Sequence, residues 1–288
     1  MIDKPAGWTS HDVVGKARRI TGTKKIGHLG TLDPIATGVL PLVLGGATRL
    51  AQFYTRSDKI YEGVIRFGWS TLTYDRAGEA TSEKTEPQID AAALEQALER
   101  FRGGVLQTPP PVSAKKVEGR RAYRLAREHV TVELVPVPVE VYELTLLDVA
   151  GPLARVRAHC SGGTYMRSIA HDLGQLLGCG AHLEDLRRLA SGEFEIAQAR
   201  TIAQLESLAA GERLIDALVP AAQMLPGMAA VLVDDRTASL IRNGRNFPAS
   251  PFRSQPASRY VKAITRDHRL VAIGEAVLPN LYHPVVVL

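Results

Sequence analysis

The most informative stretch of the sequence is Gly27-His28-Leu29-Gly30-Thr31-Leu32-Asp33-Pro34-Ile35-Ala36-Thr37-Gly38. Its glycines permit tight backbone geometry, and the proline restricts Asp33 to an extended or turn conformation. Apolar neighbours on both sides would hold the Asp33 carboxylate against a hydrophobic wall. Such a carboxylate beside a cation is a candidate nucleophile or base, whereas many Asp-Pro pairs simply begin a turn. The spacing alone leaves both interpretations open.

Outside this loop, helical and strand-like patterns alternate along the chain. Apolar residues at helical spacing, together with end signals, predict helices over residues 10–20, 90–101, 166–177 and 202–218. Apolar runs or alternation predict strands at Val39–Leu44, Ile60–Trp69, Val130–Leu147 and Leu153–Cys160. These patterns predict an α+β chain with antiparallel strands.

The C-terminal part of the sequence has a different pattern. Pro220–Gly227 predicts a linker, and short β-type runs follow it, separated by Arg, Asn, Gly and Pro. These runs are Val231–Val233, Tyr260–Ile264, Leu270–Ile273 and Val285–Leu288. We therefore expect a large domain over residues 1–222 and a small β-rich domain over residues 228–288.

Composition narrows the class of protein. The chain has 288 residues, of which 45% are hydrophobic and 23% are charged, so it can bury a core and is not a disordered protein. Its 2 cysteines cannot build a disulfide framework, and they suggest a reducing compartment. No apolar stretch approaches the ~20 residues that span a bilayer, and no signal peptide is evident. We expect a soluble cytoplasmic protein whose net charge of +5 suggests an anionic partner.

Two other clusters resemble known kinds of site only superficially. Cys160, Cys179 and His182 could be drawn as zinc ligands, but the paired C-x₂-C spacing is absent, which favours a buried thiol at Cys160. His171-Asp172 resembles a metal-phosphohydrolase dyad, yet it lies in a predicted helix without companion ligands, which favours a place on the helix surface or a capping role. We therefore expect no metal.

A basic segment follows the proline-rich run Thr108–Pro111. Residues 112–129 carry six Lys or Arg and two Asp or Glu, with Tyr123 among them. A solvated helix face would usually carry matching acids, which this segment lacks. Cations on a projecting element suit a phosphate backbone, because each contact releases counterions.

Six ordered motifs resemble those of the TruB family of tRNA pseudouridine synthases. They are Gly27–Gly38, Asp3–Ser10 (DKPAGWTS), Ser57–Tyr61 (SDKIY), Ser113–Tyr123 (SAKKVEGRRAY), Gly163–Ser168 (GTYMRS) and Gly178–Leu189 (GCGAHLEDLRRL). The resemblance covers residues 2 to about 200. It implies a mixed, largely antiparallel sheet with flanking helices, the pseudouridine synthase fold, and a C-terminal PUA-like RNA-binding domain.

The resemblance also implies an activity, the isomerisation of uridine 55 in the T-loop of tRNA to pseudouridine, without a cofactor. Asp33 would be the nucleophile, attacking either the sugar C1′ or the uracil ring. Tyr61 would stack on the uracil and take the C5 proton. Arg167 would pair with Asp33 and keep it ionised when substrate excludes water.

Further residues are expected to bind substrate by the same resemblance. Tyr165 and Leu186 would line the pocket, Lys4 belongs to the N-terminal motif, and His28 would fill the space left by the flipped base, although a histidine in a loop often has no such role. Residues 109–129 correspond to the thumb loop that closes over RNA, and its expected contacts are Lys116, Arg120, Arg121 and Arg124.

The sequence departs from the family pattern at three positions. Val112 replaces a common aromatic, Leu72 a common acid, and Gly162 a residue that is often Lys. We expect a stand-alone monomer that acts on the T-arm of tRNA, with no membrane and no obligate protein partner. One rival is a dyskerin-like enzyme that works inside a guide-RNA complex, and another is a tRNA chaperone with a decayed active site.

Overall fold

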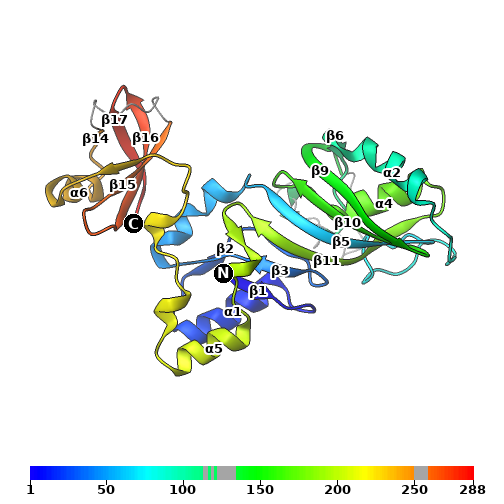
Figure 1. The fold of residues 1–288 in the computed structure, drawn as a ribbon. Coiled ribbons are helices and arrows are strands. Elements are labelled where there is room, and N and C mark those ends of the chain that lie inside the picture. The colour runs from blue at the N-terminus through cyan, green and yellow to red at the C-terminus, as the bar shows by residue number, and fades with distance from the viewer. Residues whose placement is uncertain (113–115, 118–119, 122–133, 250–258) are drawn as a thin grey trace. The chain divides into compact units, whose positions relative to one another are not determined.

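A computed structural model of the chain describes residues 1–112, 116–117, 120–121, 134–249 and 259–288. The chain forms two compact units (Figure 1). The first unit comprises Met1–Val13, Gly30–Pro41 and Thr55–Ile202, and the second comprises Val14–Leu29, Leu42–Tyr54 and Ala203–Leu288. In the described part of the chain, no helix combines the length and the apolar character that crossing a membrane requires.

An eight-stranded sheet forms the first unit. Its order is β1-β3-β11-β5-β10-β9-β6, with β12 paired to β11. The strands are β1 (Ile2–Lys4), β3 (Thr37–Leu40), β5 (Lys59–Phe67), β6 (Gly103–Gln107), β9 (Val137–Ala150), β10 (Leu153–Cys160), β11 (Ala181–Ser191) and β12 (Phe194–Glu195). All pairs are antiparallel except β3 with β11, which is parallel. The predicted α+β class with a mixed, largely antiparallel sheet is therefore confirmed.

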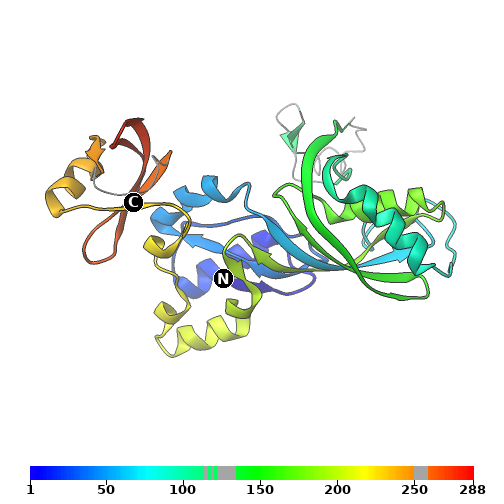
Figure 2. The same cartoon turned by 45° about the horizontal axis from the view of Figure 1, so that its top comes forward.

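Two helices lie along one side of this sheet. Helix α4 (Met166–Leu176) packs on β11 and β5, and α2 (Ala91–Leu98) packs on β9 and contacts α4. Figures 1 and 2 show both helices on the same side of the strands. Strand β5 alternates strictly between buried and half-buried residues, as expected for a sheet with one packed face. The helix predicted from Asp90 is confirmed, since the Asp90 carboxylate accepts a hydrogen bond from the backbone N–H of Ala92.

Strand β11 was not predicted as a strand, although it is central to the sheet. Its buried side chains include His182 and Arg188, which break the apolar alternation that identifies a strand in sequence. Its pairing with β5 also shifts by one residue between Leu183 and Asp185. The positions that face inward therefore no longer follow one alternating series along the strand.

Two predicted elements end earlier than expected. The strand predicted over Val39–Leu44 is divided at Pro41 into β3 and β4 (Leu42–Leu44), because proline has no N–H to continue the ladder. Strand β4 pairs with β2 (Ile26–His28) in a two-stranded sheet of the second unit. The helix predicted to reach Leu218 stops as α5 (Ile202–Ala210), and Glu212 adopts a positive φ of 56°.

The second unit contains a five-stranded sheet in the order β13-β15-β16-β17-β14. Its strands are β13 (Ala230–Leu232), β14 (Phe247–Pro248), β15 (Tyr260–Ile264), β16 (Leu270–Leu278) and β17 (Leu281–Val287). Helix α6 (Asp235–Arg242) was not predicted, although Asp234 caps it by accepting a hydrogen bond of 2.8 Å from the Thr237 N–H. The C-terminal β domain is present, while its PUA-like character and the division at residues 222–228 stay predictions.

The remaining elements connect these parts. They are helix α1 (Ser10–Thr21), the short strands β7 (Lys116–Val117) and β8 (Arg120–Arg121), and the 3₁₀ segments η1 (Gly45–Tyr54), η2 (Glu99–Phe101), η3 (Ile196–Gln198), η4 (Leu214–Ala217) and η5 (Ala221–Gln223). The buried residues Val14 and Ala17 of α1 pack with Ile26 of β2, which matches the apolar side predicted for this helix.

Candidate active site

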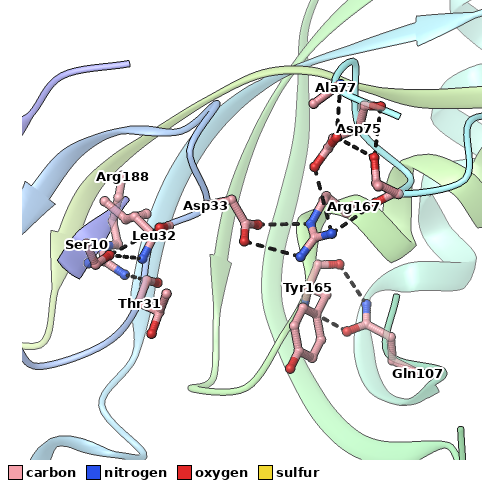
Figure 3. A network of polar contacts seen from close by, with 11 residues as sticks. Ser10, Thr31, Leu32, Asp33, Asp75, Ala77, Gln107, Tyr165, Arg167 and Arg188 are labelled. Atoms are coloured by element: carbon pink, nitrogen blue, oxygen red, sulfur yellow. Dashed lines mark hydrogen bonds and ion pairs between the residues drawn. The ribbon is translucent and has the colours of Figure 1, made fainter. Parts of the chain in front are cut away.

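The loop that carries Asp33 is fixed to its surroundings by hydrogen bonds on both sides of the carboxylate. The buried Ser10 hydroxyl accepts a hydrogen bond of 2.9 Å from the Leu32 N–H and donates one of 3.1 Å to the Leu32 carbonyl (Figure 3). After Asp33, the Pro34 carbonyl accepts a hydrogen bond of 2.8 Å from the Gly7 N–H. The N-terminal motif therefore holds the Asp33 loop in place.

Arg167 engages Asp33 through two of its nitrogens. Its Nε lies 2.9 Å from Oδ2 as an ion pair, and its Nη2 donates a hydrogen bond of 3.2 Å to Oδ1. Helix α4 supplies Arg167 from its first turn, and the guanidinium is only 4% exposed, whereas the Asp33 side chain is 35% exposed. The bidentate pair fixes the orientation of a carboxylate that remains open on one side.

A second carboxylate and a carbonyl hold the far side of the same guanidinium. Nη1 of Arg167 donates to the Thr73 carbonyl at 2.9 Å and lies 3.8 Å from Oδ2 of Asp75. Asp75 is itself held, because its Oδ1 accepts hydrogen bonds from the Thr73 hydroxyl at 2.6 Å and from the Ala77 N–H at 3.0 Å. Figure 3 shows Arg167 between the two aspartates. An oriented, partly exposed carboxylate of this kind can serve as a nucleophile.

Tyr61 lies in the centre of β5, where it is 8% exposed. Burial raises the pKa of its hydroxyl, and the positive charge of the neighbouring Arg188 acts in the opposite direction. Arg188 lies opposite Tyr61 in the pairing of β11 with β5, and its guanidinium donates hydrogen bonds to two backbone carbonyls just before Asp33. The structure therefore brings Asp33, Tyr61 and Arg167 into one site.

Tyr165 is the residue that precedes α4, and a buried amide fixes its backbone. Oε1 of Gln107 accepts a hydrogen bond of 2.7 Å from the Tyr165 N–H, and its Nε2 donates one of 3.0 Å to the Tyr165 carbonyl. Leu186 of β11 is buried opposite Gly63 of β5, two positions along the strand from the pair of Arg188 with Tyr61. Both residues thus belong to the elements that carry the catalytic candidates.

The other predicted binding residues are placed differently. Lys4 is fully buried, and its ammonium donates to the carbonyls of Pro5 at 2.9 Å, Trp8 at 2.6 Å and Pro34 at 3.4 Å. These contacts give Lys4 a role in holding the Asp33 loop, and its contact with substrate stays a prediction. His28 lies in β2 of the second unit.

The expected thumb lies mostly outside the described residues. Lys116 is in β7, Arg120 and Arg121 are in β8, and these two short strands pair with each other. Arg124 lies outside the described residues. Binding of RNA by these four residues stays a prediction.

Several residues that build the site were not predicted from the sequence. Ser10, Gln107, Asp75 and Arg188 support or contact the catalytic candidates, and three of them lie in segments already singled out for other reasons. Ser10 ends the N-terminal motif, Asp75 follows the Leu72 departure, and Arg188 lies in the Gly178–Leu189 motif. Gln107 has no such signal, because only the fold brings it to Tyr165.

The described residues contain no group of three or more His, Cys, Asp or Glu side chains that could hold a metal ion. Both cysteines are free thiols, and Cys160 is buried as predicted. Burial raises the pKa of the Cys160 thiol to about 11, which makes it a poor nucleophile near neutral pH.

Comparisons with known proteins cover the whole chain. Residues 18–166 match the model of the TruB family pseudouridylate synthase N-terminal domain, and residues 167–226 match that of the tRNA pseudouridylate synthase B C-terminal domain. A tRNA pseudouridine synthase B of Solibacter usitatus is 74% identical over 288 residues, which cover 100% of this chain and 98% of the relative. A tRNA pseudouridine synthase B of Dehalococcoides mccartyi is 38% identical over 283 residues, which cover 98% of this chain and 93% of the relative.

Solved structures show the same fold. A chain from an H/ACA RNP bound to a substrate RNA containing 2′-deoxyuridine superposes with a TM-score of 0.73 at 24% identity, covering 100% of this chain and 82% of that one. A chain from a Cbf5-Nop10-Gar1 complex superposes with a TM-score of 0.72 at 27% identity, covering 97% and 78%. Neither family model reaches residues 228–288.

Proposed function

The chain belongs to the TruB family of pseudouridine synthases, and from this membership we propose that it isomerises uridine 55 in the T-loop of tRNA to pseudouridine. The coarser activity, conversion of uridine to pseudouridine in tRNA by an isomerase, follows from the curated relatives. The choice of uridine 55 rests on the resemblance of the ordered motifs, and it is the part that needs experiment.

Asp33 is the proposed nucleophile. The observation that carries this assignment is the bidentate ion pair with Arg167, which orients the carboxylate and leaves it 35% exposed. When a bound nucleotide excludes water, the attraction between the two groups strengthens because the local dielectric falls. Asp33 then attacks the nucleotide, either at C1′ of the sugar or on the uracil ring.

Tyr61 is the proposed partner of the uracil. In the isomerisation the N1–C1′ bond breaks, a C5–C1′ bond forms, C5 loses a proton and N1 gains one. The Tyr61 oxygen takes the C5 proton, and its ring stacks on the base. Tyr61 is buried in β5 opposite Arg188, whose guanidinium binds the backbone just before Asp33, and this placement supports the role, since both groups must reach one nucleotide.

The target base must leave its stack to reach this site, at a cost of a few kcal/mol. We propose that His28 fills the vacated space, that Tyr165 and Leu186 line the pocket, and that Lys4 supports the loop below it. Lys116, Arg120, Arg121 and Arg124 would contact phosphates from the thumb, and residues 228–288 would act as a PUA-like RNA-binding domain. In this proposal the enzyme is a cytoplasmic monomer that works alone and without a cofactor.

Release of tritium from uridine C5 tests the proposal. Unmodified tRNA labelled at C5 should lose tritium from uridine 55 when the wild-type protein is added. The Asp33→Asn variant should bind the same tRNA without releasing tritium. Release by Asp33→Asn would contradict the nucleophile assignment, and a tRNA in which uridine 55 is replaced by cytidine serves as the control for position.

A dyskerin-like, guide-dependent enzyme is the second candidate, and the superposition on chains from an H/ACA RNP and from a Cbf5-Nop10-Gar1 complex is the observation that favours testing it. The same assay separates the two, because the purified protein and one tRNA are the only macromolecules present. Turnover under these conditions supports the stand-alone enzyme. If there is no turnover until a guide RNA is added, the guide-dependent alternative is supported.

A further inference from the structure

Arg188 places a buried guanidinium against the loop that carries Asp33. It lies in β11 at the position that pairs with Tyr61 of β5, and it is 1% exposed. Its hydrogen bonds to described residues run to backbone carbonyls rather than to a carboxylate. Burying a cation without a partner of opposite charge is costly, so these contacts must compensate for the lost water.

The three carbonyls that Arg188 contacts lie on both sides of Asp33. Nη2 donates to the Gly30 carbonyl at 3.1 Å and Nη1 to the Thr31 carbonyl at 3.3 Å, just before the aspartate. Nε donates to the Val39 carbonyl at 2.8 Å, beyond the end of the loop. One side chain therefore fixes the separation between the two ends of the Asp33 loop.

The backbone of Arg188 holds the same loop. In the parallel pairing of β3 with β11, Arg188 lies opposite Gly38, which has a φ of +99°. A Cβ at Gly38 would lie 2.2 Å from the Arg188 carbonyl oxygen, so the two backbones approach as closely as glycine allows. Arg188 therefore holds residues 30–39 both through the hydrogen bonds of its side chain and through the pairing of its backbone with β3.

The charge of Arg188 also reaches the other catalytic candidate. Burial raises the pKa of Tyr61, and the positive charge of Arg188, opposite it in the neighbouring strand, acts in the other direction. Burial first, and the charge of Arg188 second, lower the pKa of Lys59 to about 8, so the same charge also acts on this lysine. A nearby positive charge favours the phenolate, which is the form of the side chain that accepts a proton.

We propose that Arg188 is a positioning residue that links the elements carrying Asp33 and Tyr61: its side chain holds both ends of the Asp33 loop, and its place opposite Tyr61 in the pairing of β11 with β5 ties that loop to the strand of the tyrosine. The link to proton removal rests on the proposed function of Tyr61, whereas the hold on the loop does not. No contact of Arg188 with substrate is required.

Two variants and one control test the hold on the loop. Arg188→Gln removes the charge and leaves one donor nitrogen in place of three. Arg188→Lys keeps the charge but also has a single donor nitrogen in place of the spread guanidinium. Arg66→Gln, on β5, serves as the control because Arg66 pairs with Glu86 and not with the loop. Amide hydrogen exchange should become at least about tenfold faster over residues 30–39 in both Arg188 variants and stay unchanged there in Arg66→Gln.

A titration of the phenolate tests whether the charge of Arg188 acts on Tyr61. The ultraviolet difference between each protein and its Tyr61→Phe counterpart isolates the ionisation of this one tyrosine. The pKa of Tyr61 should be higher in Arg188→Gln than in wild type, should rise less in Arg188→Lys, and should not change in Arg66→Gln. If Arg188→Gln does not fold, Arg188→Lys carries both measurements.

Three results would overturn the proposal. They are unchanged exchange over residues 30–39 in a folded Arg188 variant, faster exchange spread evenly over the whole sheet, and an unchanged titration of Tyr61. None of these readouts depends on turnover. If Tyr61→Phe still releases tritium from tRNA, the proposed role of Tyr61 fails while the measured link between Arg188, the loop and the phenol stands.

Discussion

Arg167 shows how one residue can be held so firmly that it orients another. Its guanidinium contacts Asp33 on one edge and Thr73 and Asp75 on the other, and nearly all of it is buried. Because both edges are occupied, the side chain cannot rotate without breaking several charge-assisted contacts. These contacts fix the direction of the Asp33 carboxylate, and in the proposed reaction such orientation would lower the barrier to attack.

Helix α4, which carries Arg167, also carries His171 and Asp172, whose contacts the sequence did not predict. His171 and Asp172 were expected on the surface of the helix, yet the ring of His171 stacks on Tyr74 with centroids 3.7 Å apart and planes at 7°. Tyr74 has a φ of +62°, a strained value for a bulky residue, immediately after the Thr73 carbonyl that binds Arg167. The stack holds this strained turn in place, so it supports Arg167 indirectly.

Asp172 in this group gives a prediction about stability. Burial raises the pKa of Asp172 from 3.8 to about 6, so the folded state keeps a proton that the unfolded chain has already released. The free energy of unfolding should therefore fall as pH rises from about 4 to about 6. Asp172→Asn should raise the free energy of unfolding at pH 7 by about 1 kcal/mol, after allowance for partial solvent screening.

Urea unfolding of Asp172→Asn at pH 7 and below pH 4 measures this effect. The gain over wild type should disappear below pH 4, where Asp172 is protonated in both states. Asp148→Asn, which changes an exposed carboxylate of β9, serves as the control and should change little at either pH. A gain that is equal at both pH values would contradict the assignment to ionisation.

Among the elements, the parallel junction of β3 with β11 decides where the catalytic loop lies. Arg187 and Arg188 of β11 pair with Thr37 and Gly38 of β3. Strand β11 also pairs with β5, which carries Tyr61, so one strand aligns the end of the Asp33 loop with the tyrosine. A shift of one residue in this strand would turn the inward side chains outward and separate the two groups.

The pairing of β3 with β11 requires glycine at position 38, because a side chain there would collide with the backbone of Arg188. Gly38→Ala should lower the free energy of unfolding by about 3 kcal/mol or more, because the new Cβ would lie 2.2 Å from a backbone oxygen at a φ that alanine disfavours. Gly15→Ala is the matched control, since nothing lies within 4 Å of a Cβ there and the residue is inside α1. In Gly15→Ala the free energy of unfolding should rise by about 0.5–1 kcal/mol. Thermal unfolding measures both, and equal stability of the two variants would contradict the argument.

For the whole molecule, the modest net charge hides an uneven distribution. Residues 1–30 carry six Lys or Arg and two acids, residues 112–129 carry six and two, and residues 228–288 carry eight and four. The rest of the chain is therefore net negative. A tRNA bound at several places along its backbone would be attracted by such segments and repelled elsewhere.

Salt dependence of tRNA binding tests this distribution. Replacing Arg120, Arg121 and Arg124 with Gln should weaken binding and reduce the slope of log K against log salt by about 1 for each phosphate that is no longer neutralised. The control replaces the exposed Arg100, Arg155 and Arg213 with Gln, an equal change of charge outside the basic segments. If both triple variants show the same slope, the thumb has no special role.

The sequence by itself determined the family, the α+β class and the three residues that the structure brings into one site, Asp33, Tyr61 and Arg167. It could do so because motifs and helical or strand spacing depend on residues close together in the chain. It did not predict β11, because buried charged side chains mask its alternation, nor the break at Pro41, where the chain passes from one sheet to another.

Only the tertiary structure decided how the site is held. Ser10, Asp75, Gln107 and Arg188 reach the catalytic candidates through contacts between residues far apart in the chain, up to 158 positions between Arg188 and Gly30. Such contacts depend on the register of β11 against β3 and β5 and on the packing of α4, which no local pattern encodes. The role of the buried Arg188 guanidinium depends on the backbone carbonyls that accept its hydrogen bonds, and only the arrangement of the surrounding strands brings these carbonyls to it.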